Sequence, residues 1–146
     1  MTNNKDAQKT KLDKQAHRSL VFWATDCAEH VLPYFEKEYP EDDRPRKAIE
    51  AGRAWVRDKI TMGEVRVAAF AAHAAARDAD HTAARAAARA AGHAAATAHV
   101  ASHAPHAADY AATAAEAANV VEEREWQYRH LPEHLRPIAL KFLKRF

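Results

Sequence analysis

The chain has few of the residues on which several common protein classes depend. Its 146 residues include one cysteine, Cys27, three glycines and two serines. A single cysteine excludes a disulfide framework within the chain. Three isolated glycines form no Gly-rich loop of the kind that holds phosphate groups, and neither Ser19 nor Ser102 stands in a nucleophile-elbow motif. The composition therefore argues against a disulfide scaffold, a nucleotide site and a serine hydrolase.

Long apolar runs and a strong net charge are also missing. No window of about 18 residues is apolar enough to cross a bilayer, and the first residues lead into no apolar core of signal-peptide type. We therefore expect a soluble, cytoplasmic protein that does not enter a membrane. The formal net charge of +2 is too mild to indicate a nucleic-acid partner. No segment shows the sustained period-two alternation of a strand, so strands are not expected.

Alanine dominates what is present. It supplies 29 of the 54 residues from Val65 to Ala118, and because its side chain loses no entropy in a helix, this stretch should be almost entirely helical. Small side chains bury little area, so such helices need bulkier neighbours. Trp23 and Trp126 flank the stretch and are predicted to be core clamps. The sequence predicts an all-α fold, a compact bundle of about six helices with Ala-rich central helices.

The chain divides into a short arm and one domain. Residues 1–16 are polar and lack apolar periodicity, so they are predicted to be a flexible N-terminal arm, and residues 17–146 a single helical domain. Cap and turn residues, among them Asp43, Thr61 with Glu64, and Ser102, mark the helix starts. The predicted helices span about residues 17–35, 44–59, 62–79, 83–101 and 103–130, followed by a short helix after Leu131 and Pro132.

The densest run of one charge sign lies between the first two predicted helices, from Glu36 to Asp43. One interpretation is structural: Asp43 caps the second helix and its neighbours form local ion pairs. The other is a surface that binds a charged partner, for which the candidate residues are Glu41, Asp42, Asp43, Arg44 and Arg46.

Histidine is unusually frequent, with ten residues, six of them between positions 73 and 106. His99, His103 and His106 have helical spacing, but a helix break at Ser102 would separate them, and no complete metal-ligand motif is present. We therefore predict no metal, no cofactor and no catalytic residue. The alternative is a metal-dependent helical-bundle enzyme that uses His73, His93 and His99; otherwise His73 and His93 lie between helices as hydrogen-bonded core groups. Cys27 is predicted to be a small apolar residue of the core.

Four stretches together point to a known family: residues 23–28 (WATDCA), 43–51 (DRPRKAIEA), 91–100 (AGHAAATAHV), and 125–127 (EWQ) with Leu131 and Pro132. They resemble the Imm-five-like putative immunity proteins of bacteria and archaea. The resemblance implies a compact helical protein that protects a cell by binding a cognate protein toxin, and it supplies no catalytic residue. A structural or oligomerising Ala-rich module, and thus a homo-oligomer, stays open as a second alternative.

Overall fold

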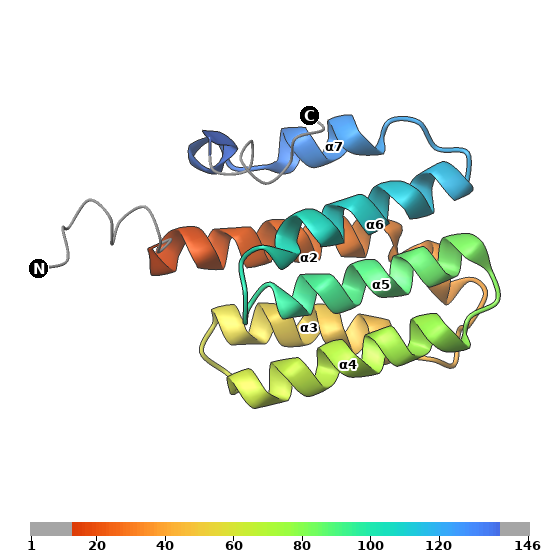
Figure 1. Ribbon diagram of the computed structural model, residues 1–146, viewed down its shortest axis with the longest axis horizontal. Coiled ribbons are helices and arrows are strands. Elements are labelled where there is room, and N and C mark those ends of the chain that lie inside the picture. Colours follow the sequence, from red (N-terminus) through yellow and green to blue (C-terminus); the bar gives the residue numbers. More distant parts are fainter. Residues whose placement is uncertain (1–12, 138–146) are drawn as a thin grey trace, which may run out of the picture.

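A computed structural model describes residues 13–137, which form six α-helices and one 3-10 helix, with no strand among them. The α-helices are α2 (Lys14–Glu36), α3 (Arg44–Val56), α4 (Met62–Asp78), α5 (Thr82–Ala96), α6 (His103–Ala117) and α7 (Glu123–His130), and η1 (Glu133–Leu135) follows. Consecutive helices run in opposite directions (Figure 1). The predicted all-α bundle is confirmed. Most of the predicted arm, residues 1–16, lies outside the described residues, and its last three residues are helical because α2 begins at Lys14.

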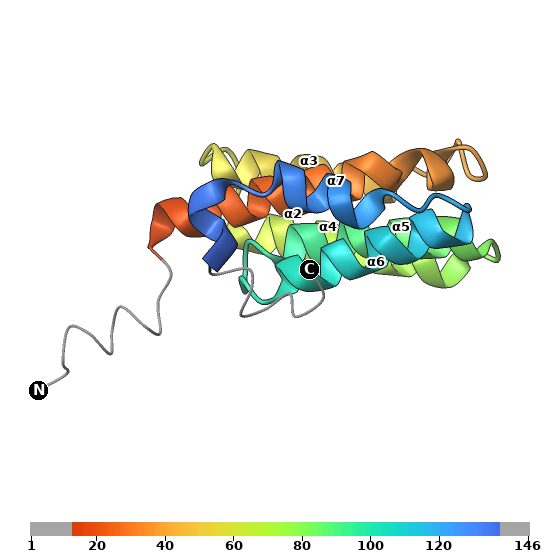
Figure 2. The same ribbon diagram turned by 90° about the horizontal axis from the view of Figure 1, so that it is seen from above.

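The helices lie in two layers, and α2 contacts helices of both. Figure 2 shows α2 and α3 in one layer and α4, α5 and α6 in the other, while α7 runs along the edge formed by α2 and α6. The core contains large side chains from α2, including Trp23, Leu32 and Phe35, each about 1% exposed. They pack against α5, where ten of fifteen residues are buried and nine of those ten are alanines, whose small side chains let the helices approach closely.

Short side-chain caps explain where several helices begin. Asp13 accepts a 2.8 Å hydrogen bond from the Ala16 amide at the start of α2. Thr61 and Glu64 form the predicted capping box at the start of α4. The predicted break after Asp78 is also confirmed, and there His81 Nδ1 accepts a 3.3 Å hydrogen bond from the Ala84 amide.

One predicted helix is wrong: residues 103–130 form two helices rather than one. α6 ends at Ala117 because Asn119 adopts a left-handed backbone conformation with φ of 62°. The Val120 amide then donates a 2.8 Å hydrogen bond back to the Ala115 carbonyl, which closes the helix end in the Schellman pattern. α7 starts only at Glu123, so its direction is set independently of α6.

The two predicted clamps differ in burial. Trp23 is 1% exposed and fills the core as expected, and Cys27 beside it is fully buried, which confirms its role as a small core residue. Trp126 is only partly buried. Its ring is stacked between the imidazoles of His30, with centroids 3.7 Å apart, and His130, at 4.0 Å. Trp126 therefore covers the outside of α2 instead of filling the core.

Candidate partner-binding site

Residues 37–43, which we call the acidic turn, connect α2 to α3. The turn lies beside the connection from α4 to α5 at one end of the bundle (Figure 1). The Tyr39 hydroxyl joins the two connections by accepting a 2.8 Å hydrogen bond from the Asp80 amide. This contact adds Asp78 and Asp80 to the carboxylates of the turn. We call the surface formed by Glu38, Glu41, Asp43, Asp78 and Asp80 the acidic end.

Three of the five predicted site residues hold the turn together. Arg44 donates to both carboxylate oxygens of Asp42, at 2.9 and 2.7 Å, and to Asp78 at 3.0 Å. These contacts lower the pKa of Asp42, chiefly through the hydrogen bonds from Arg44. Arg46 makes a two-pronged contact with Glu36 at the end of α2, in which its Nε lies 2.7 Å from Oε2. The arginines of the predicted site therefore fix the fold of the turn.

The predicted helix cap at Asp43 is wrong in its detail. Asp43 occupies the N-cap position of α3, but its side chain makes no cap hydrogen bond and instead lies 3.2 Å from Lys47. The carboxylate of Asp42 accepts a 3.1 Å hydrogen bond from the Arg44 amide. The neighbouring carboxylate thus satisfies the start of the helix, because the backbone of Asp43 is not in the extended conformation that a capping residue adopts.

Charges with little local neutralisation remain at the acidic end. Glu41 and Asp80 are exposed, and within residues 13–137 neither forms an ion pair. Glu38 is also exposed, and among residues 13–137 its one neighbour at ion-pair distance is the His81 ring, 3.8 Å away. The surface can therefore attract a basic group, and it presents no nucleophile paired with a base.

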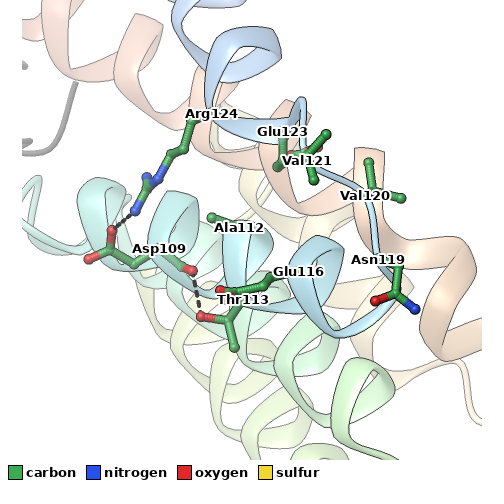
Figure 3. A pocket seen from close by; sticks show the side chains of 9 residues that line it. All are labelled: Asp109, Ala112, Thr113, Glu116, Asn119, Val120, Val121, Glu123 and Arg124. Carbon is green, nitrogen blue, oxygen red and sulfur yellow. Dashed lines mark hydrogen bonds and ion pairs between the residues drawn. The ribbon is translucent and has the colours of Figure 1, made fainter.

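A groove of about 610 Å³ lies between α6 and the loop that leads to α7, a feature that the sequence analysis missed. The groove exists because α6 stops at Ala117, so Asn119 was its signal in the sequence. Arg124 reaches across it to Asp109, and the Thr113 hydroxyl donates to the Asp109 carbonyl at 3.0 Å (Figure 3). The other lining residues are Ala112, Glu116, Asn119, Val120, Val121 and Glu123.

Glu123 connects this groove to the interior of the bundle. Its side chain is 4% exposed, and Oε2 lies 2.7 Å from Nδ1 of His30 on α2. Burial raises the pKa of the Glu123 carboxyl, while His30 favours its charged form. Gln127, one turn later and fully buried, donates a 2.8 Å hydrogen bond to the Ala108 carbonyl. These polar contacts hold α7 on the bundle, so the side chains of Glu123 and Gln127 have structural partners. Glu116 is the exposed carboxylate of the groove.

The histidines form a cluster between α4, α5 and α6 that differs from the predicted set. His93 is its centre: its Nδ1 lies 3.0 Å from Nδ1 of His103, and its ring contacts those of His73, His106 and Tyr110, with centroids 4.8 to 5.3 Å apart. His73 is packed so closely against α5 that a Cβ at Gly92 would lie 2.6 Å from its Nε2.

His73 and His93 therefore do lie between helices, as one interpretation of the sequence held. His99 is exposed in the turn after α5 and takes no part in the ring contacts among the described residues. Burial lowers the pKa of His93 to about 3.

Across residues 13–137, no three His, Cys, Asp or Glu side chains are grouped so that they could hold a metal ion. Nor is any helix in that range long and apolar enough to span a membrane.

Comparison with known proteins gives one match. The model of a family described as Imm-5 like putative immunity protein covers residues 10–134, which includes α2 to α7. No curated protein and no solved structure matches the chain. The match contains the acidic turn, the histidine cluster and the helix α7. Since it extends over most of the chain, this protein belongs to the Imm-5 like putative immunity protein family.

Proposed function

We propose that the protein binds and neutralises a cognate protein toxin without catalysing a reaction, and that the acidic end is the surface that meets the toxin. The observation that carries this proposal is the family match over residues 10–134, because immunity proteins act on toxins. The toxin itself would present a basic surface. Toxins that cut nucleic acid have such surfaces, since their clefts must attract phosphate groups.

The geometry supports the acidic end for a physical reason. Tyr39 fixes two connections against each other, so the exposed carboxylates of Glu41 and Asp80 lie on one surface that needs no rearrangement to bind. A preformed surface loses less conformational entropy on binding than a flexible one. Charge complementarity of this type acts mainly on the association rate and on the choice of partner.

The test uses a toxin encoded beside the immunity gene and two charge-reversal variants of equal size. Glu38→Lys with Glu41→Lys reverses two exposed charges and leaves the Asp42 contact with the Arg44 amide intact. The control, Glu116→Lys with Glu125→Lys, makes the same change in net charge on α6 and α7. Association rates are measured at low and high salt, and growth of toxin-producing cells reports protection.

The first variant should associate at least about tenfold more slowly at low salt and lose most of its salt dependence, while the control should bind as the wild type does. If the control loses binding and the first variant does not, the toxin meets the groove beside α6. If the wild-type protein neither binds nor protects against the adjacent toxin, the proposed function itself is wrong.

A further inference from the structure

One face of α4 exposes large apolar side chains. α4 packs against α3 and α5 and forms the edge of the bundle opposite α7 (Figure 1). On its outer face Val67 is 68% exposed and Phe70 is 65% exposed. Beside them a groove of about 710 Å³ lies between α3 and α4, lined in part by Val67, Ala68 and Ala71. An exposed aromatic ring next to an apolar groove is typical of an interaction surface.

The exposed face has two different flanks. Residues seven apart lie on nearly the same line of a helix with 3.6 residues per turn. Phe70 and Arg77 therefore form one row on α4, while Glu64, Ala71 and Asp78 form a parallel row on the other side of Val67. One flank carries the aromatic ring and the cation, and the other carries the groove and the carboxylates.

The charges on these flanks have few local partners. Arg77 is exposed and forms no ion pair with any residue between 13 and 137. Asp78 is 71% exposed although it contacts Arg44, so one of its faces is open to a second cation. The two rows are thus complementary to each other in shape and in charge, which is the property a surface needs to pair with a copy of itself.

We propose that two copies of the chain pair through α4, side by side and parallel, about a two-fold axis along the helix. This symmetry places the Phe70 row of each copy against the Ala71 row of the other at the same height. Each Phe70 ring then enters the groove beside Ala71 of the second copy, and each Arg77 meets Asp78 of the second copy. An antiparallel pair would instead bring like flanks together.

Small residues at the centre of the face allow the close contact. Ala71 and Ala74 lie on either side of the line through Val67, and alanines in these positions permit an interaxial distance near the lower limit of about 8 Å. The proposed pairing engages Asp78 at the margin of the acidic end but not Glu38, Glu41 or α7, so a dimer could still bind two toxin molecules. Self-association does not rest on the proposed function, although the two surfaces share Asp78.

Sedimentation velocity of the purified full-length chain tests the pairing over a wide range of concentrations. The expected result is a reversible equilibrium between a 16.3 kDa species and one of twice that mass. Phe70→Glu should leave only the smaller species. The matched control is Val121→Glu, because Val121 is 93% exposed but lies in the loop before α7, and this variant should dimerise normally. A wild-type protein that stays monomeric at all concentrations would overturn the proposal.

Two further variants test the parallel arrangement. Arg77→Asp should raise the dissociation constant about tenfold, because the two-fold axis repeats the change, and adding Asp78→Arg should restore pairing. Ala74→Cys should form a disulfide between copies under mild oxidation, since in a parallel pair residue 74 faces its own counterpart. The native Cys27 is buried and does not compete. A dimer that depends on Phe70 but gives no cross-link at position 74 would refute the parallel pair.

Discussion

The indole nitrogen of Trp23 donates a 2.8 Å hydrogen bond to the main-chain carbonyl oxygen of Gln127, which lies 104 residues later in the chain. This buried contact joins α2 to α7 and makes one aromatic residue responsible for two tasks. The ring fills the core, and its N–H satisfies a carbonyl that has lost access to water.

We expect Trp23→Ala to lower the free energy of unfolding by about 3 to 5 kcal/mol, because it leaves a cavity and an unpaired carbonyl. Trp23→Phe keeps most of the volume but not the donor, and should cost about 1 to 3 kcal/mol. Trp126→Ala should cost less than Trp23→Ala, since Trp126 is only partly buried. Denaturant titrations followed by far-UV circular dichroism measure all three, and equal losses for the two alanine variants would contradict the difference in burial.

Two glycines in helices, Gly92 and Gly63, allow the close packing of His73 against α5 to be tested, because only Gly92 lies against the His73 ring. Gly92→Ala should destabilise the protein although alanine favours helix, because its Cβ would lie under 3 Å from three atoms of the His73 ring. Gly63→Ala should be neutral or stabilise by up to about 1 kcal/mol, since the nearest atom is 3.8 Å away. Thermal unfolding compares the two. In a double-mutant cycle, His73→Ala should relieve the cost of Gly92→Ala.

The histidine cluster should make the protein less stable in acid. Burial, together with positive neighbours such as Arg89, lowers the pKa of His93 from 6.5 to about 3 and also lowers those of His73 and His103. The unfolded chain therefore binds more protons than the folded one between these values, and the free energy of unfolding falls as the pH falls from about 6.5 toward 3.

His93→Asn removes the central titrating group and should flatten this part of the stability profile relative to the wild type. Urea titrations across that pH range provide the measurement. The control is His134→Asn, because His134 is exposed in η1, outside the cluster, and its loss should leave the profile unchanged. Identical slopes for His93→Asn and the wild type would show that the cluster is not the source of acid sensitivity.

The start of α3 distinguishes two neighbouring aspartates. Asp42→Ala should cost about 1 kcal/mol or more, because it removes the acceptor for the Arg44 amide and the partner of the Arg44 side chain. Asp43→Ala should cost less than about 0.5 kcal/mol, since it breaks only an exposed contact with Lys47. Chemical denaturation of the two variants measures the difference, and a larger loss for Asp43→Ala would restore the cap that the sequence predicts.

The bundle itself is predictable from the sequence because alanine propensity, local caps and one amphipathic helix all favour the same structure. Thr61 with Glu64 acts over three residues, so its effect does not depend on the rest of the fold. The end of α6 is harder to predict. Asn119 is the residue that ends the helix, but the glutamates and Trp126 that follow favour helix as well.

The candidate site is less predictable because charge density alone does not say which charges are already paired. Arg44 and Arg46 directly follow the acidic turn in the sequence, yet each pairs with a carboxylate on another helix, Arg44 with Asp78 on α4 and Arg46 with Glu36 on α2. The contact between Tyr39 and Asp80 likewise joins residues 41 positions apart. The ring contacts of His93 depend on the packing of α4 and α6, which helical spacing within one segment cannot reveal.

The central place of α2 has a consequence for synthesis on the ribosome. α2 is the first of the described helices to leave the ribosome, yet two of the helices that cover it, α5 and α6, are made only after residue 81. Its apolar stripe from Leu20 to Phe35 is therefore only partly covered, by α3, while the intervening residues are translated. Chains stalled before α6 should consequently recruit chaperones, and release should occur once α6 can close over α2.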